Sequence, residues 1–103
     1  MTNDLMITIL NELNIDYAYH HFKKPPEGDA YIAYFEDEKV RFLADDKVYG
    51  WEPSFAVELY TKNKDLTTES QLISLFDKYE VVWSGGESVW IDSEQIYQTV
   101  FYC

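Results

Sequence analysis

Residues 55–72, FAVELYTKNKDLTTESQL, decide how this chain folds, because they join its clearest strand to its clearest helix. Phe55, Val57 and Leu59 alternate with Ala56 and more polar positions, which is typical of a strand that buries one face. A charged turn at residues 62–65 follows. The stretch therefore predicts a strand, a solvated turn and then a helix.

The helix after this turn has both a start signal and a buried stripe. Thr67 or Thr68 can cap it, and Thr68 with Gln71 fits a capping box. Apolar side chains then recur at helical spacing on one side, at Leu72, Leu75, Phe76 and Tyr79. We expect this face to pack on the sheet.

The N-terminal part predicts a second amphipathic helix over about residues 3–14. Thr2 or Asn3 can cap it, Asp4 favours the positive end of its dipole, and Asn14 is a plausible stop. Residues 15–22 alternate as in a half-buried strand. Residues 23–29 contain two prolines and predict a loop.

Acidic clusters and a glycine pair separate the remaining predicted strands. Residues 30–35 and 39–44 are rich in strand-forming residues, and the cluster between them predicts a hairpin turn at Glu36, Asp37 and Glu38. A second turn is expected at Asp45, Asp46 and Lys47. Residues 81–83, 89–91 and 95–102 read as strands, with a turn at residues 84–86 that contains the glycine pair.

These elements predict a single α+β domain over residues 1–103. Each helix has one apolar stripe to bury, so the economical packing is a two-layer one. We expect a mostly antiparallel sheet of five to six strands with two helices on one face.

Charge and cysteine content exclude several classes of protein. The net charge of −11 disfavours a protein that coats phosphate backbones, so sequence-specific nucleic-acid binding is not expected. Cys103 is the one cysteine, which rules out an intrachain disulfide and favours a reducing cytoplasm. The N-terminal residues lack the basic start and apolar run of a signal peptide, and no stretch has the length of a membrane span. We therefore expect neither export by that route nor insertion in a membrane.

No constellation of residues predicts catalysis, a cofactor or a metal. His20 and His21 are adjacent on an expected strand, so their side chains should point to opposite faces and bind no common ion. The glycine pair lacks the lysine and hydroxyl residue of a phosphate loop, and Cys103 lacks a basic neighbour. We expect a protein that is not an enzyme and takes no cofactor.

Tyrosines are the more informative feature. A two-layer fold of this size cannot bury all of them, and exposed tyrosine favours an interface. The alternative is packing in the core and across strands. The tyrosines concerned are Tyr17, Tyr19, Tyr31, Tyr34, Tyr49, Tyr60, Tyr97 and Tyr102.

Strand and turn signatures carry a resemblance to a known family. They are a proline pair ahead of YIAY, ADD before a strand, ELYTKNKD leading into a helix, and a closing strand of the type E-x-x-Y-x-x-x-F. Together they resemble the small tail-terminator or tail-completion proteins of long-tailed phages and prophages of Gram-positive hosts. The resemblance extends over about residues 1–103.

This resemblance implies a structural protein of the virion, assembled in the host cytoplasm. It implies a ring of identical copies, commonly a hexamer, that caps the tail tube and docks to the head connector. The partners would be the protein itself, the tail-tube protein and the head-connector protein. The acidic surface would face the lumen of the tube. This chain is shorter than many tail terminators, so we expect little room for long arms between subunits.

The charged turn at residues 62–65 has two interpretations. It is either a plain solvated turn or, in addition, a contact between copies of the protein. Lys62 and Lys64 could meet the acidic residues of a neighbour and set its orientation. The acidic candidates are Glu36, Asp37, Glu38, Asp45 and Asp46. Tyr60 and Tyr97 complete the predicted interface.

Two other classes of function stay open at this point. An acidic protein of this size could mimic nucleic acid and inhibit a host defence enzyme, which would require carboxylates clustered on one face. A ligand-binding or enzymatic domain of ferredoxin-like type would require a site constellation.

Overall fold

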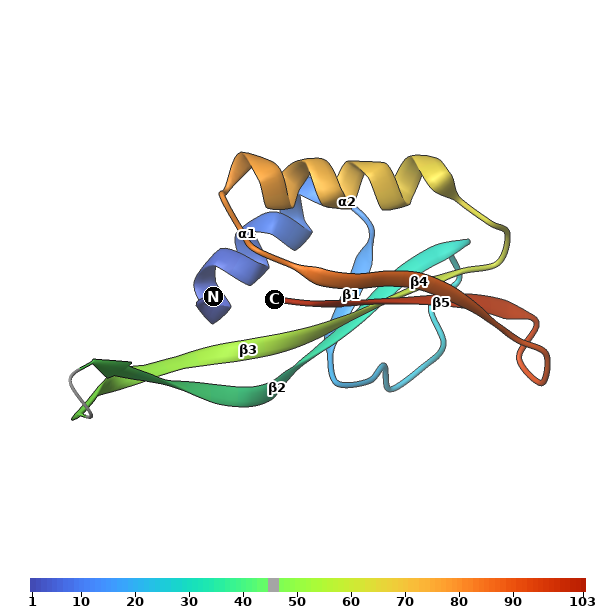
Figure 1. Cartoon of the computed structure of the whole chain (residues 1–103). Coiled ribbons are helices and arrows are strands. Elements are labelled where there is room, and N and C mark those ends of the chain that lie inside the picture. Colours follow the sequence, from blue (N-terminus) through green and yellow to red (C-terminus); the bar gives the residue numbers. More distant parts are fainter. Residues whose placement is uncertain (45–46) are drawn as a thin grey trace.

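A five-stranded sheet with two helices on one face makes up the fold (Figure 1). The computed structural model describes the backbone of residues 1–44 and 47–103 and the side chains of residues 1–37 and 53–103. Its elements are α1 (Asn3–Leu13), β1 (Asp16–Tyr19), β2 (Ala30–Ala44), β3 (Lys47–Thr61), α2 (Leu66–Lys78), β4 (Ser84–Ile91) and β5 (Ile96–Tyr102). The strand order is β1-β2-β3-β5-β4; β1 and β2 are parallel and the other pairs antiparallel. The predicted α+β class is confirmed.

Helix α1 begins and ends at the residues that the sequence indicates. The Oγ1 atom of Thr2 accepts a hydrogen bond from the backbone N–H of Leu5 at 3.2 Å. Asn14 ends the helix in the left-handed region with φ 62°, a conformation that asparagine tolerates better than most residues. Both capping predictions for this helix are confirmed.

Helix α2 is capped by Asp65, so the prediction of Thr67 or Thr68 as the cap is wrong. The Asp65 carboxylate accepts bonds from the backbone N–H of Thr68 at 3.0 Å and from its Oγ1 hydroxyl at 2.7 Å. Thr68 is therefore a donor to the cap, and the capping box with Gln71 does not form around it. These bonds lower the pKa of Asp65, with the Thr68 hydroxyl contributing most.

The core lies between the helices and the middle of the sheet. Phe55, Val57 and Leu59 of β3 are all buried, which confirms the predicted core face. They pack with side chains from both helices, β2 and β5, namely Met6, Ile9, Leu10, Leu13, Ile32, Tyr34, Leu72, Phe76 and Phe101. Leu75 and Tyr79 of the predicted α2 stripe are only partly buried at its border.

Strands β2 and β3 are longer than predicted, because no turn interrupts β2 at Glu36, Asp37 and Glu38. Glu36 pairs with Phe55 and Glu38 with Ser54, so Asp37 occupies a bulge in a continuous ladder. A bulge places the extra residue without ending the strand. The turn predicted at Asp45 and Asp46 lies outside the described residues.

The C-terminal hairpin also turns at a different place from the one predicted. Residues 81–83 form no strand, and residues 84–86 open β4 with an irregular register after Gly85. Both glycines have the expected positive φ, 86° at Gly85 and 89° at Gly86. The reversal occurs at residues 92–95, where the backbone N–H of Gln95 donates to the carbonyl of Asp92 at 3.3 Å.

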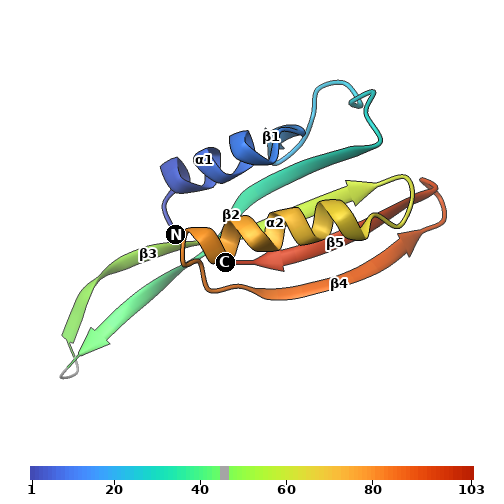
Figure 2. The ribbon, with the colours of Figure 1, turned by 90° about the horizontal axis from the view of Figure 1, so that it is seen from above.

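One end of the β2–β3 hairpin projects beyond the rest of the sheet (Figures 1 and 2). β1 pairs with β2 only over residues 31–34, and β5 pairs with β3 only over residues 56–61. Residues 36–44 and 47–54, here called the arm, run on as a two-stranded ribbon. The arm makes the molecule elongated, with extents of 49 × 27 × 24 Å.

Candidate interaction surface

The arm presents two long backbone edges. In a two-stranded ribbon, each strand pairs on one side and leaves N–H and C=O groups on the other, a template for pairing with another chain. Where β3 leaves β5, Phe55 and Cys103 exchange two backbone hydrogen bonds of 2.6 and 3.0 Å. Pro53, two residues further, faces the same side of β3 and has no N–H to leave unpaired.

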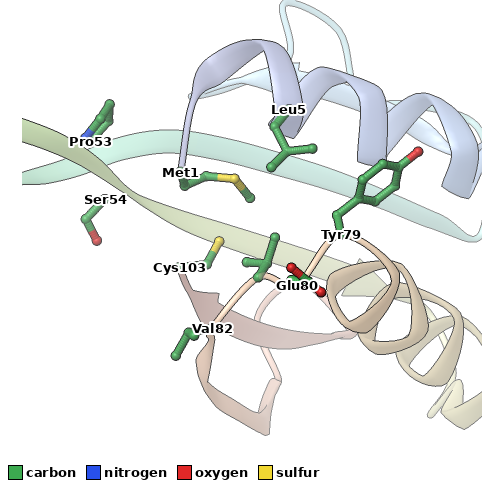
Figure 3. Close-up of a pocket in the computed structure, with 9 residues that line it drawn as sticks. Met1, Leu5, Pro53, Ser54, Tyr79, Glu80, Val82 and Cys103 are labelled. Atoms are coloured by element: carbon green, nitrogen blue, oxygen red, sulfur yellow. The ribbon is translucent and has the colours of Figure 1, made fainter.

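An apolar hollow of about 360 Å³ lies at the root of the arm. Figure 3 shows the side chains of Met1, Leu5 and Cys103 facing one another across it. The rest of the lining comes from β3 and from the connection between α2 and β4: Pro53, Ser54, Tyr79, Glu80, Val81 and Val82. Val82 is 90% exposed beside this hollow, so apolar surface is open to contact here.

The thiol of Cys103 has low reactivity in this position. Burial raises the pKa of its thiol to about 11, and the amino terminus lowers it by a smaller amount. A thiol in that state carries little thiolate near neutral pH. The hollow is therefore an apolar contact surface with no activated nucleophile at Cys103.

Both lysines of the predicted interface have carboxylate partners within the chain. Lys64 Nζ lies 2.9 Å from Glu69 Oε1 and 2.5 Å from Ser88 Oγ. Lys62 Nζ lies 3.6 Å from Asp29 Oδ1, and both of these side chains are exposed. Lys62 is thus available to another molecule at small cost, whereas Lys64 is part of the fold.

Lys64 belongs to a polar cluster with Glu69, Ser88 and Thr99, here called the Glu69 cluster. The Ser88 hydroxyl is 3.0 Å from Glu69 Oε1 and 2.6 Å from the Thr99 hydroxyl. Glu69 is only 9% exposed, and its Oε2 atom is buried without a hydrogen-bond partner among the described residues. The cluster ties the first turn of α2 to β4 and β5, a contact that the sequence did not reveal.

Three acidic residues of the predicted interface, Glu36, Asp37 and Glu38, lie on β2 where the arm begins. Glu36 and Asp37 are exposed on β2 where the arm begins, and the Glu36 backbone N–H donates to the Tyr19 hydroxyl at 3.1 Å. The side chains of Glu38, Asp45 and Asp46 lie outside the described residues. The acidic candidates thus include two that face solvent at the arm's root.

Tyr60 and Tyr97 lie on opposite faces of the sheet and form no common surface. Tyr60 stacks on Tyr31 with ring centroids 5.1 Å apart, on the face that the helices leave uncovered. Burial raises the pKa of Tyr60, and its hydroxyl accepts a bond from Gln98 Nε2 at 2.9 Å. Tyr97 is in register with the core-facing side of β3 and packs against Trp90, with centroids 4.8 Å apart.

Among the side chains that the structure describes, the most exposed aromatic ones are different from Tyr60 and Tyr97. Tyr19 is 53% exposed, Tyr102 45% and Trp90 42%. Trp90 lies on β4 next to Tyr97, and its Nε1 donates to Asp92. The sequence interpretation did not name Trp90, because an edge strand exposes side chains on the face that a central strand buries.

The expectation that the side chains of His20 and His21 point to opposite faces of a strand is wrong. β1 ends at Tyr19, and His20 takes a left-handed backbone with φ 69°, so strand alternation no longer applies. The two rings face each other, with their Nδ1 atoms 3.1 Å apart.

Comparison with protein families and curated proteins identified no relative of this chain. No protein-family model matches this chain, and no curated protein matches it at a significant level. Within the part of the chain that the structure describes, no helix has both the length and the apolar character to cross a bilayer.

Proposed function

We propose that this protein is a structural protein of a long-tailed phage or prophage that acts at the tail end or head–tail junction. Copies of it assemble into a ring that caps the tail tube and docks to the head connector. The proposal rests on the sequence signatures of tail-terminator proteins together with one structural observation, the projecting arm.

The arm supports assembly because the ladders of β1 and β5 end before it, at Tyr34 and Ala56, and its two strands pair with each other. Another chain can therefore pair along an outer edge of the ribbon. A marginal two-stranded ribbon gains stability when a third strand or an apolar surface covers it. In a ring, every copy offers its arm to one neighbour and receives an arm from the other, a head-to-tail contact that closes when the rotation between neighbours divides a full turn. The short length of the chain led us to expect little room for an arm between subunits, and residues 36–44 and 47–54 provide one.

The hollow at the root of the arm supplies a second contact surface of suitable chemistry. It combines apolar lining residues with the nearly fully exposed Val82. Exposed apolar surface next to a hollow favours contact with an apolar side chain. Lys62, whose pair with Asp29 is exposed, adds a charge that a neighbour's acidic residues can meet.

Mass measurement tests this function directly. Light scattering over a range of concentrations, with and without purified tail-tube protein, should show a closed oligomer or a cap on the tube. A variant in which Asn-Gly replaces residues 39–53 joins the paired residues Glu38 and Ser54 by a two-residue turn. It should keep the fold by circular dichroism and lose assembly.

Charge reversal at Lys62 gives a finer test. Lys62→Glu should weaken assembly more than Lys23→Glu, which makes the same change of charge in the loop before β2. Lys64→Glu is not a clean variant, because it places a second carboxylate against buried Glu69. A strict monomer that never caps tubes would overturn the proposal, and tight inhibition of a host nuclease would replace it with nucleic-acid mimicry.

A further inference from the structure

His20 and His21 are adjacent in sequence, and the fold brings their rings together. Because His20 has φ 69°, the chain reverses directly after β1 and both side chains fall on the same side. Their Nδ1 atoms are 3.1 Å apart, and the rings meet edge to face with centroids 5.3 Å apart. Both residues are exposed to solvent.

The surrounding contacts hold this arrangement in place. The backbone N–H of His20 donates to the carbonyl of Tyr34 at 2.7 Å, which continues the pairing of β1 with β2. The backbone N–H of His21 donates to the carbonyl of Tyr19 at 2.8 Å. The His20 ring packs against Phe35, with centroids 5.8 Å apart. The pair is therefore ordered by the sheet before any ligand arrives.

Two imidazole nitrogens at this separation match the bite of a transition-metal ion. With metal–nitrogen distances of about 2.0–2.1 Å, neighbouring ligands lie about 2.9 Å apart in a square-planar site and about 3.4 Å apart in a tetrahedral one. The observed 3.1 Å lies between these values. We propose that His20 and His21 form a two-imidazole chelate for a borderline divalent cation, with Cu²⁺ and Ni²⁺ bound in preference to Zn²⁺.

Binding requires a change of tautomer and a small rotation of the rings. In the hydrogen-bonded pair one Nδ1 carries the proton and the other accepts it. When the ion binds, both Nδ1 lone pairs turn toward it, and the proton of the donor ring moves to its Nε2 atom through solvent. Two neutral rings bind the ion, so no net proton is released from the neutral pair.

The site is a bidentate one on a single chain. No group of three or more histidine, cysteine or carboxylate side chains within the described ranges 1–37 and 53–103 is placed to hold a metal. Water completes the coordination. The preference for Cu²⁺ and Ni²⁺ over Zn²⁺ follows from the general order of affinity of nitrogen sites.

Titration calorimetry with CuCl₂, NiCl₂ and ZnCl₂ tests the chelate on the full chain. We expect one ion per chain and affinity in the order Cu²⁺, Ni²⁺, Zn²⁺. His20→Asn keeps a residue that tolerates positive φ, and His21→Asn removes the second ring. Each variant should weaken binding roughly tenfold or more, by analogy with the loss caused by changes around metal sites.

Controls separate the pair from the other possible ligands. Cys103→Ser and an acetylated amino terminus remove the thiol and amine near the hollow, and binding should persist in both. Nitrogen-15 spectra should report coordination at Nδ1 on both rings. Unchanged binding in His20→Asn or His21→Asn, or coordination at Nε2 between two chains, would overturn the proposal.

Discussion

Lys64 Nζ lies 2.9 Å from Glu69 Oε1, so a partly exposed ammonium group neutralises a carboxylate that the fold has almost completely buried. Removal of Lys64 leaves this carboxylate with hydroxyl donors alone, and one of its oxygens has no partner among the described residues. We expect Lys64→Met to lower the free energy of unfolding by about 1–2 kcal/mol, since the lysine is partly solvated. Urea unfolding measures this.

A double-mutant cycle shows whether the loss comes from the stranded charge. Glu69→Met leaves Ser88 and Thr99 able to bond each other, so Lys64→Met should cost little once Glu69 is also methionine. Lys62→Met, at the exposed pair with Asp29, should cost less than about 0.5 kcal/mol. Equal losses for Lys64→Met and Lys62→Met would contradict the assignment.

Gly85 has no room for a side chain. A Cβ atom there would lie 2.5 Å from the carbonyl oxygen of Val100, and its φ of 86° is unfavourable for other residues. Gly85→Ala should therefore lower the free energy of unfolding by about 1–3 kcal/mol. Gly28→Ala is the matched control, because its Cβ would meet no atom closer than 3.6 Å. Thermal unfolding that ranked the two variants equally would count against this reading of β4.

Asp65 links helix α2 to acid stability. Its carboxylate has a pKa below the ordinary value, so its contribution is present above the unfolded pKa and is lost as pH falls through the folded pKa. Asp65→Ala should cost about 1 kcal/mol at pH 7. Asp65→Asn should keep most of the cap but remove the acid dependence of this residue. A wild-type slope of stability with pH below 4 that Asp65→Asn leaves unchanged would show that other groups dominate.

Cys103 should react slowly with thiol reagents. Its pKa is raised from 9.0 to about 11, so the thiolate fraction near pH 8 is about a hundredfold below that of an unperturbed thiol. Iodoacetamide should alkylate the native chain about a hundredfold more slowly than the urea-unfolded chain. The same shift makes stability fall as pH rises above about 9, and Cys103→Ser should abolish that component. Similar rates in the two states would refute burial of the thiol.

Local signals predicted both helices and the core face, apart from the residue that caps α2. Thr2 and Asn14 bound α1 through bonds with near neighbours in sequence, and the alternation of Phe55, Val57 and Leu59 reports burial directly. The prediction of a turn at residues 36–38 was wrong because a cluster of charged residues is a weak signal for the end of a strand. Those residues pair with β3 across a bulge, and the pairing overrides the local preference.

The candidate surface was less predictable, because its contacts join distant parts of the chain. Glu69 lies in the first turn of α2, where an acidic residue is favourable on local grounds alone. Its burial depends on Ser88 and Thr99, which only the pairing of β4 with β5 brings together. The contact between His20 and His21 was not predicted for a different reason, because no residue near His20 in the sequence indicates a positive φ at that position.

Strand β5 follows both β3 and β4 in the sequence but lies between them in the sheet. Ala56 pairs with Tyr102 and Thr61 with Tyr97, so this ladder closes a long loop, whereas β2 and β3 are neighbours along the chain. Long closures cost more entropy and slow the steps that need them. The β2–β3 ribbon should therefore form early during refolding, with β5 inserting late. The backbone N–H groups of Ala56 and Glu58 point to β2, and those of Val57 and Leu59 point to β5, on the same side as that of Phe55. Pulse-labelled hydrogen exchange should therefore protect the Ala56 and Glu58 amides before the Val57 and Leu59 amides.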